Sequence, residues 1–211
     1  MNKIIQVNPE DPSAGIISDA AEIIKKGGVI AFPTRCLYGL GADALNTTTV
    51  DRVFAIKQRP VQKPILVLIN SAMQLERLVK NVSTAAACLM EHFWPGRITL
   101  VFEAGETVPV NLTARTGKIG IRIPANAVAS ALVKAVQRPI TGTSANLSGS
   151  PGCCRIADLE PQVTRQLDLI LDAGTLKGGK GSTVVDVTGA PPRILREGEV
   201  SKQEIMALFD K

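Results

Sequence analysis

Four residues in two short motifs carry the side chains needed to bind an anionic ligand. Lys57 and Arg59 are separated by one residue, and Ser144 and Asn146 have the same spacing later in the chain. Lysine and arginine supply positive charge, and the guanidinium fork of arginine fits phosphate or carboxylate oxygens. Serine and asparagine add neutral hydrogen-bond donors. Together these residue types predict a site for a nucleotide or a similar polyanion.

The basic residues are concentrated in two segments that contain no acidic residue. Residues 52–75 and 107–157 together hold ten of the 24 lysines and arginines in a chain whose net charge is +5. Like charges placed this close repel one another, so an anionic ligand explains the clusters well. Solvated surface loops are the alternative explanation.

The composition excludes several classes of protein. A chain of 211 residues that is 45% hydrophobic can bury a large core and is too apolar to be disordered. It contains no apolar run of the about 18 to 20 residues that a membrane span needs. The N-terminus lacks the apolar core of a signal peptide, and the four cysteines form no C-x-x-C pair, so we expect reduced thiols in the cytoplasm. A single histidine, His92, excludes histidine triads and histidine-rich zinc sites.

The elements that must position the two motifs alternate between strands and helices. One helix is expected to bury Ile16, Ala20, Ile23 and Ile24. Alternation of this kind predicts a single α/β domain with a mixed or largely parallel sheet. Apolar runs predict strands at 29–33, 65–69, 97–102, 118–124, 139–142, 169–172 and 183–187. Periodicity and capping residues predict helices at 15–26, 46–57, 126–136 and 202–209, and after Ser71 and Ser83.

Polar loops next to these strands are the expected location of the site. Their small residues let backbone N–H groups approach a phosphate closely, although the same residues are also common in ordinary turns. The phosphate-binding patterns G-x-x-x-x-G-K-[ST] and G-x-G-x-x-G are absent. The loops concerned are 33–44, 57–64, 141–149 and 177–183, with 194–198 following.

Six motifs that occur in a fixed order are more specific than any one loop. They are PTRCLYGL (33–40), KQR (57–59), WPGRIT (94–99), RIP (122–124), SAN (144–146) and STVVD (182–186). In these motifs the chain resembles the YrdC family, the threonylcarbamoyl-AMP synthases, in its single-domain form, from about residue 14 to residue 200. The resemblance implies one YrdC-like domain over 1–211, with an open, twisted, mixed β-sheet flanked by helices and a basic cleft.

The resemblance also implies an activity. Members of the family synthesise threonylcarbamoyl-AMP from ATP, L-threonine and bicarbonate, with release of pyrophosphate. A downstream threonylcarbamoyl-transferase machinery then modifies tRNA. We therefore expect these substrates and partners, and no membrane. Mg²⁺ is expected to arrive with the ATP phosphates, and no metal-ligand residues are predicted, because the sequence shows no cluster of carboxylates.

The site residues implied by the resemblance fall into three groups. Lys57 and Arg59 would stabilise charge at the phosphate under attack, and Ser144 and Asn146 would hold phosphate and ribose. Arg122 would bind the threonine carboxylate. The ATP site would comprise these four catalytic residues together with Lys63, Lys118 and Arg196. The threonine and bicarbonate site would comprise Arg122, Thr34, Cys36, Gly142 and Ser182.

Two positions in the first loop depart from the family pattern. Arg35 stands where the family has an acidic residue, and Cys36 stands where it has a second threonine. Arg35 either reverses the charge beside the amino-acid pocket or points to solvent. Two other hypotheses are a non-catalytic RNA-binding protein in tRNA or ribosome maturation, and a YciO-like relative with another substrate. Retention of both the K-x-R and the S-x-N motif favours the synthase over these two hypotheses.

Overall fold

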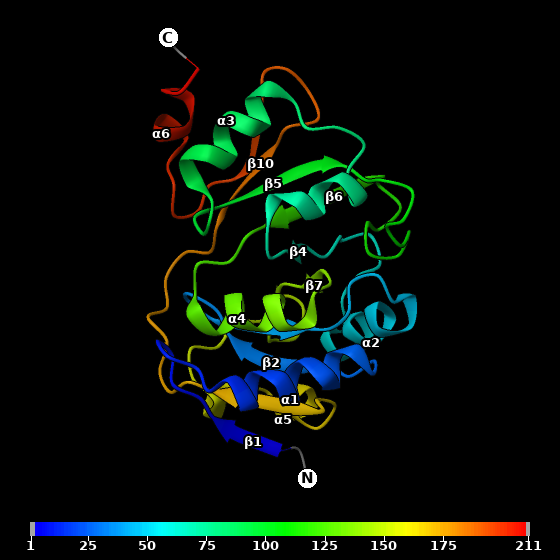
Figure 1. The fold of residues 1–211 in the computed structure, drawn as a ribbon, viewed down its shortest axis with the longest axis vertical. Coiled ribbons are helices and arrows are strands. Elements are labelled where there is room, and N and C mark those ends of the chain that lie inside the picture. The colour runs from blue at the N-terminus through cyan, green and yellow to red at the C-terminus, as the bar shows by residue number, and fades with distance from the viewer. Residues whose placement is uncertain (1–2, 210–211) are drawn as a thin grey trace.

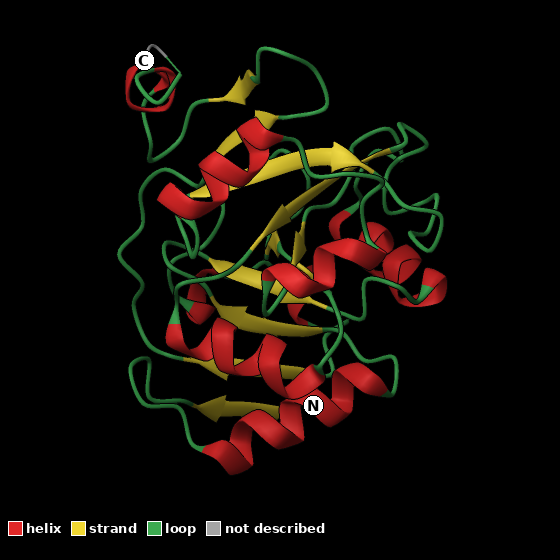
Figure 2. Cartoon of the chain, turned by 45° about the horizontal axis from the view of Figure 1, so that its top comes forward, coloured by secondary structure: helices red, strands yellow, loops and turns green. Residues whose placement is uncertain are grey.

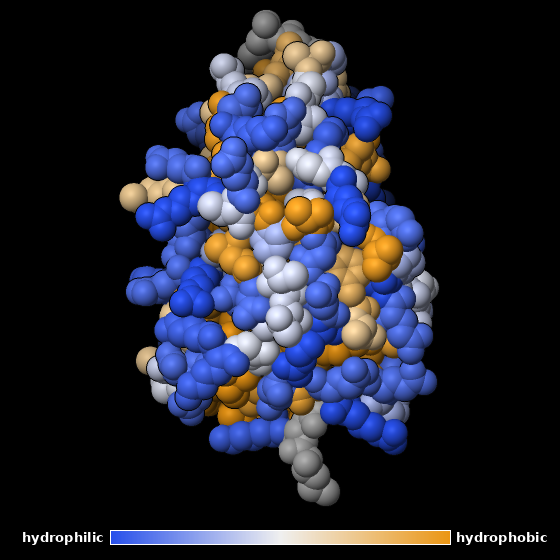
Figure 3. Space-filling view, turned by 90° about the vertical axis from the view of Figure 1, so that its right-hand side faces the viewer, coloured by the Kyte–Doolittle hydropathy of each residue, from blue (hydrophilic) through white to orange (hydrophobic). Residues whose placement is uncertain are grey.

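The computed structural model describes residues 3–209. The strands of this part of the chain form two mixed sheets, which follow one another along the long axis of the molecule (Figure 1). The predicted mixed α/β class is confirmed, with the strands divided between two sheets instead of one. The face shown in Figure 3 is largely hydrophilic, with small apolar patches between the polar side chains. No helix within residues 3–209 is long and apolar enough to cross a membrane.

The lower sheet in Figure 1 has five strands in the order β1-β9-β2-β3-β8. Strands β1, β9 and β2 run parallel, and β3 is antiparallel to both β2 and β8. The strands are β1 (Lys3–Gln6), β2 (Ile30–Pro33), β3 (Tyr38–Gly41), β8 (Thr143–Ser144) and β9 (Leu169–Asp172).

The upper sheet has six strands in the order β11-β10-β5-β6-β4-β7. Strand β5 is parallel to β10 and antiparallel to β6, which is parallel to β4. The strands are β4 (Val67–Leu68), β5 (Ile98–Glu103), β6 (Lys118–Arg122), β7 (Ile140–Thr141), β10 (Thr183–Asp186) and β11 (Arg193–Arg196).

Helices cover both sheets. Helices α1 and α4 lie side by side on one face of the lower sheet, as Figures 1 and 2 both show, and α3 packs on the upper sheet. The helices are α1 (Ala14–Lys25), α2 (Thr47–Lys57), α3 (Thr84–Phe93), α4 (Ala127–Val136), α5 (Pro161–Thr164) and α6 (Lys202–Met206), with 3₁₀ helices η1 (Ala72–Arg77) and η2 (Ile156–Asp158).

The hydrophobic core lies on both faces of the lower sheet, which explains the unbroken apolar run of β2. Ile30 and Phe32 pack with α1 and α4, whereas Ala31 faces a second cluster that contains residues of α2. All three side chains are fully buried. A strand that is buried on both faces needs apolar residues at every position, so the run at 29–33 predicted a strand correctly.

Local signals also fix α2, which ends at a site residue. The side chain of Asn46 accepts a hydrogen bond from the backbone N–H of Thr49 at 3.3 Å, as expected for an N-cap. Val50, Val53 and Phe54 face the core. The helix therefore begins and ends as predicted, and its last residue is Lys57.

Other expectations were wrong in detail. The fully buried residues of α1 are Ile17, Ala20, Ala21 and Ile24, whereas the predicted Ile16 and Ile23 are half-buried against the same cluster, so the buried stripe is centred further round the helix than predicted. Ser71 begins a 3₁₀ helix without a side-chain cap, whereas Ser83 caps α3 as predicted. The loop predicted at 33–44 contains strand β3, and 194–198 contains part of β11.

The chain passes between the two sheets close to the motifs. Strand β7 pairs in the upper sheet and β8 pairs in the lower one, with only Gly142 between them. A Cβ atom at Gly142 would lie 2.7 Å from Cδ1 of Leu66 and 2.8 Å from Cγ of Leu68. A side chain at this position would therefore have to displace Leu66 and Leu68. A longer connection, residues 173–182, rises along the left-hand side of Figure 1 from β9 to β10.

Candidate active site between the two sheets

A cavity of about 610 Å³ lies between the two sheets. One wall is formed by strands β5, β6, β10 and β11 of the upper sheet. The other wall is formed by the β2–β3 turn and β8 of the lower sheet. Every polar loop singled out in the sequence contributes at least one lining residue. The lining includes seven basic and two acidic side chains, so the cavity favours an anionic ligand.

The upper wall follows from the alternation of side chains along β6. Lys118, Gly120 and Arg122 line the cavity, whereas Ile119 and Ile121 are buried in the core. A Cβ atom at Gly120 would lie 3.4 Å from Cγ2 of Thr99, across the cavity wall. The absence of a side chain at this position leaves space between the two basic residues.

Arg122 is prepared to bind an anion. Among the described side chains, its Nε is the buried polar atom that has no hydrogen-bond partner. Burial lowers the pKa of Arg122 to about 10, and the positive charges of Arg196 and Arg35 act in the same direction. A carboxylate placed beside Arg122 would supply both the missing acceptor and the missing counter-charge.

Lys118, at the other end of β6, is already paired. Its Nζ donates to Oδ2 of Asp186 and to Oγ1 of Thr188, both at 2.8 Å. Burial opposes ionisation of Asp186, but the hydrogen bonds from Lys118 and Thr188 outweigh it and hold the pKa of this carboxyl group below its ordinary value. This end of the cavity is therefore polar without a large net charge.

Hydroxyl groups lie between these two ends. Oγ1 of Thr99 and Oγ of Ser182 are 2.8 Å apart and both residues are buried. The guanidinium of Arg196 donates to the carbonyl oxygen of Ser182 at 2.8 Å. This contact holds Arg196 against the start of β10.

The opposite wall begins with a tight turn. The backbone N–H and the hydroxyl of Thr34 both donate to the carbonyl oxygen of Leu37, at 3.1 and 2.6 Å. The carbonyl oxygen of Cys36 accepts from the N–H of Gly178 at 3.0 Å, and its Sγ lies 3.5 Å from the carbonyl oxygen of Lys180. The turn is therefore held against the connection between β9 and β10.

Lys57 and the S-x-N motif form one hydrogen-bonded unit behind this wall. Nζ of Lys57 donates to the carbonyl oxygens of Ser144 and Asn146 and to Oδ1 of Asn146, the latter two at 2.9 and 3.3 Å. Ser144 Oγ also donates to Oδ1 of Asn146. Burial, and after it the nearby Arg59, lowers the pKa of Lys57 to about 8. All three N–H groups of this ammonium are used inside the protein.

A left-handed residue separates the two bases of K-x-R. Gln58 has φ 47° and ψ 42°, which ends α2 and redirects the chain immediately after the buried Lys57. Arg59 therefore lines the cavity. Its Nε and one Nη donate to the carbonyl oxygens of Lys63 and Pro64 at 2.8 and 2.9 Å, which holds the guanidinium at the cavity edge.

Comparison with known proteins identifies the family. The Sua5/YciO/YrdC family model, described as telomere recombination, matches residues 22–198. The chain belongs to the Sua5/YciO/YrdC family.

Three relatives illustrate the range of the family. A Pyrococcus abyssi protein named threonylcarbamoyl-AMP synthase is 39% identical over 186 residues, which is 88% of this chain and 55% of the relative. The crystal structure of P. abyssi Sua5 complexed with L-threonine matches with a TM-score of 0.93 at 37% identity, covering 98% of this chain and 61% of that one. Escherichia coli YciO matches with a TM-score of 0.87 at 30% identity, covering 97% and 100%. The chain thus spans little more than half the length of the P. abyssi synthase.

In this Sua5/YciO/YrdC chain the cavity brings together most of the residues predicted from sequence. Lys57 and Asn146 lie behind the wall, and Lys63 is exposed outside the lining. An expected contact of Lys57 with phosphate does not fit this arrangement, because protein oxygens occupy its donors. The predicted residues that line the cavity are Thr34, Cys36, Arg59, Lys118, Arg122, Gly142, Ser144, Ser182 and Arg196.

Sequence reasoning missed several lining residues of this family member. Thr99 and Asp186 belong to motifs that were recognised, WPGRIT and STVVD, so their positions at the ends of those motifs were the available signal. Arg35, which was expected either beside the amino-acid pocket or in solvent, lines the cavity with a side chain that is 52% exposed. Glu199 also lines it, and no motif pointed to that residue.

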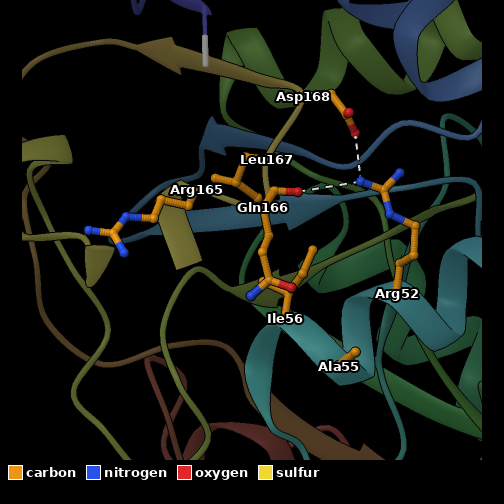
Figure 4. Close-up of a pocket in the computed structure, with 7 residues that line it drawn as sticks. All are labelled: Arg52, Ala55, Ile56, Arg165, Gln166, Leu167 and Asp168. Carbon is orange, nitrogen blue, oxygen red and sulfur yellow. Dashed lines mark hydrogen bonds and ion pairs between the residues drawn. The ribbon is translucent and has the colours of Figure 1, made fainter. Parts of the chain in front are cut away.

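A second cavity in the Sua5/YciO/YrdC chain, of about 540 Å³, lies between α2 and residues 165–168 (Figure 4). Arg52 donates there to Oδ2 of Asp168 at 3.1 Å and to the carbonyl oxygens of Gln166 and Gly27, at 3.4 and 2.9 Å, while Arg165 points away from it. None of the residues predicted for the active site lines this cavity. Arg52 thereby connects α2 to the segment that precedes β9.

The site does not hold a metal ion through its own carboxylates. Within residues 3–209, no three His, Cys, Asp or Glu side chains lie together in an arrangement suited to an ion. The two acidic residues of the cavity, Asp186 and Glu199, are paired with Lys118 and Arg35, respectively. The donor set therefore does not fit a protein-coordinated Mg²⁺.

Proposed function

We propose that this protein synthesises threonylcarbamoyl-AMP from ATP, L-threonine and bicarbonate, with release of pyrophosphate and water. The observation that carries this proposal is the cavity between the sheets, which has the unpartnered Nε of Arg122 on one wall and Arg59 with Ser144 on the other side. The P. abyssi relative named threonylcarbamoyl-AMP synthase, and the Sua5 structure that contains L-threonine, support the assignment.

The amino-acid end of the proposed site is centred on Arg122. Its guanidinium would bind the threonine carboxylate, because it lines the cavity and its buried Nε lacks an acceptor. The hydroxyl of Ser182 and the Thr34–Cys36 turn would border the amino acid. Gly142 would border the amino acid with its backbone, because a Cβ atom there would be directed at Leu66 and Leu68.

The reaction end is assigned to Arg59 and Ser144. In the proposed step, the threonine amine has taken up bicarbonate to form a carbamate with loss of water. A carbamate oxygen forms a bond to the α-phosphorus of ATP, and pyrophosphate leaves with the electrons of the P–O bond that breaks. Arg59 and Ser144 would stabilise the charge that develops on phosphate oxygens. The carbamate is already an anion, so the step needs no histidine base.

Lys57 and Asn146 would act through Ser144 instead of touching phosphate. The three hydrogen bonds of Lys57 hold both ends of the S-x-N segment, and Asn146 also binds the hydroxyl of Ser144. A reacting group is effective only when it is positioned to within a fraction of an ångström. Lys57 and Asn146 therefore contribute to catalysis by positioning Ser144.

The nucleotide is assigned to Lys118 and Arg196, which both line the cavity, Lys118 at the end of β6 away from Arg122 and Arg196 beside the start of β10. Lys63 contributes its carbonyl oxygen to Arg59 and is not assigned a direct contact. Mg²⁺ would be bound by the phosphates of ATP and enter as part of that substrate. No step of the proposal uses a protein–metal bond.

The cellular setting is part of the same proposal. The product would pass to a threonylcarbamoyl-transferase machinery that modifies tRNA. The four cysteines are free thiols, which suits the reducing cytoplasm. Both sheets contribute walls to one cavity, so we treat the chain as a single functional domain.

The test is an activity assay on the full chain. The purified protein is incubated with ATP, MgCl₂, bicarbonate and L-threonine, and pyrophosphate release and the adenylate are measured. We expect pyrophosphate only when threonine and bicarbonate are both present, and its loss in Arg59→Met. A signal that does not depend on threonine would contradict the proposal.

The likeness to E. coli YciO, which this chain covers completely, favours a second candidate function. A YciO-like protein would act on another substrate in the same cavity. Repeating the assay with the other amino acids in place of threonine separates the two. Adenylate formation with a different amino acid, and none with threonine, would support this second candidate.

A further inference from the structure

Arg35 connects the two walls of the cavity. It lies in the turn between β2 and β3 of the lower sheet, and its Nη1 donates to Oε1 of Glu199. Glu199 follows β11 of the upper sheet and is held there by its own N–H, which donates to the carbonyl oxygen of Gly181 at 3.1 Å. Both side chains line the cavity. The ion pair therefore crosses the cavity from one sheet to the other.

Glu199 is the acidic residue of the cavity that lies beside the amino-acid end. The negative charge of Glu199 raises the pKa of Arg122, whereas the positive charge of Arg35 lowers it. Arg97 also approaches Oε1 of Glu199, with its Nε at 3.4 Å, but Arg97 is at the same time bound to Glu204 of α6 at 3.0 Å. Arg35 is thus the cavity-lining arginine that holds the Glu199 carboxylate.

Two carboxylates compete for Arg122 in this arrangement. One belongs to the proposed substrate and the other to Glu199. A pair between Glu199 and Arg122 would satisfy the buried Nε that now lacks a partner, and it would do so without any substrate. Whether Arg122 stays free therefore depends on what else binds Glu199.

We infer that Arg35 is a positioning residue for substrate binding: by holding Glu199 across the cavity, it keeps Arg122 free for the carboxylate of the amino-acid substrate. This inference rests on the proposed function for the identity of that substrate. This role explains why a basic residue can be accommodated at position 35 beside the cavity. It also gives Glu199, which belongs to no recognised motif, a function in keeping Arg122 free.

Three variants test the inference through their non-additivity. In Arg35→Met the KM for L-threonine should rise at least about tenfold, because Glu199 now competes for Arg122. The KM for ATP and kcat should change little. Glu199→Gln should be close to wild type. The double variant should recover the wild-type KM, because the competing carboxylate has been removed.

Other roles for Arg35 predict different results. If Arg35 touched the substrate itself, the double variant would stay as impaired as Arg35→Met. If the ion pair only tied the two sheets together, Glu199→Gln would be as impaired as Arg35→Met. Either result would overturn the inference. Arg155→Met breaks an exposed pair with Asp158 outside the cavity and serves as the matched control, with no expected change.

A measurement without ligand separates this inference from the proposed function. The Nε–H signals of the arginine side chains can be followed by ¹⁵N NMR in the substrate-free protein. We expect the Arg122 signal to shift in Arg35→Met and to return to its wild-type position in Arg35→Met/Glu199→Gln. An unchanged Arg122 signal in Arg35→Met would overturn the inference, even if the enzyme assay succeeds. If the wild type gives no threonine-dependent product, the proposed function fails, and the NMR result still decides whether Arg35 controls Arg122.

Discussion

The Nζ atom of Lys57 lies 2.9 Å from the carbonyl oxygen of Asn146, and Lys57 is only 1% exposed. This places a lysine inside the protein as a support for the S-x-N segment. We expect Lys57→Met, which keeps the length of the side chain, to lower kcat by about 100-fold because Ser144 moves out of position. The free energy of unfolding should change by no more than about 2 kcal/mol, because unpaired carbonyl groups offset the removal of a buried charge. Activity within threefold of the wild type would contradict the role of Lys57.

The pH dependence of the reaction should report the same residue. The pKa of Lys57 is lowered from 10.5 to about 8, so the ammonium loses a proton above pH 8 in the folded state. The neutral amine has two N–H groups for three acceptors, and kcat should therefore fall above pH 8. Stability should change in the opposite direction: between pH 8 and 10.5 the unfolded chain binds more protons at Lys57, so the free energy of unfolding should rise relative to that of Lys57→Met. A flat kcat profile from pH 7 to 9.5 would contradict this.

Arg122 is expected to lower the free energy of unfolding and to be essential for the binding of L-threonine. The residue is half-buried, with a buried Nε that has no partner and a lowered pKa. Replacing a poorly compensated buried charge with an apolar side chain commonly stabilises a protein, so Arg122→Met should raise the free energy of unfolding by about 1–3 kcal/mol in urea denaturation. The same variant should lose calorimetrically measurable binding of L-threonine. A destabilised Arg122→Met would show that the guanidinium is better satisfied than the structure indicates.

Two glycines allow stability and substrate binding to be separated. A methyl group at Gly142 would lie 2.7 and 2.8 Å from Leu66 and Leu68, so Gly142→Ala should lower the free energy of unfolding by about 1–3 kcal/mol. A methyl group at Gly120 would meet Thr99 and Leu66 at 3.4 and 3.5 Å and project into the cavity. Gly120→Ala should therefore remain stable and show a raised KM. Equal loss of stability in the two variants would contradict this distinction.

The left-handed conformation of Gln58 gives a test of the K-x-R geometry. A residue with a β-carbon is strained at φ 47°, so Gln58→Gly should raise the free energy of unfolding by about 1 kcal/mol and keep activity. Gln58→Val should lower stability and, by misplacing Arg59, raise the KM for ATP. Thermal unfolding and steady-state kinetics on the two variants provide the comparison. Equal stability of the two would show that the turn is not under conformational strain.

Patterns that depend on neighbouring residues were predicted well from sequence. Asn46 and Ser83 were identified as N-caps because a cap needs only the next few residues. The strand at 29–33 was identified because its apolar run has no break. Residues 38–41 lie within the predicted loop 33–44, which directly follows a predicted strand, but they form β3. It is a strand because it pairs with β2 in a local hairpin and with β8, whose residues lie more than 100 positions further along the chain.

The candidate site, like the fold, could be predicted only in part from the sequence. Motif order pointed to most of the residues that line the cavity, but it did not reveal that Lys57 is buried. A lysine at the end of a helix is normally exposed, and only the fold brings three oxygen atoms around its Nζ. The division into two sheets was also not predictable, because strand pairing between distant segments leaves no periodic signal. Glu199 became visible only through its contact with Arg35.

Side chains alternate along β6, so its five residues contribute both to the hydrophobic core and to the cavity. Ile119 and Ile121 pack in the core, while Lys118, Gly120 and Arg122 face the cavity. Slippage of this strand by one position would exchange the two faces, moving basic groups into the core and isoleucines into the ligand space. An insertion or deletion of one residue within β6 would therefore disrupt the core and the proposed active site at the same time.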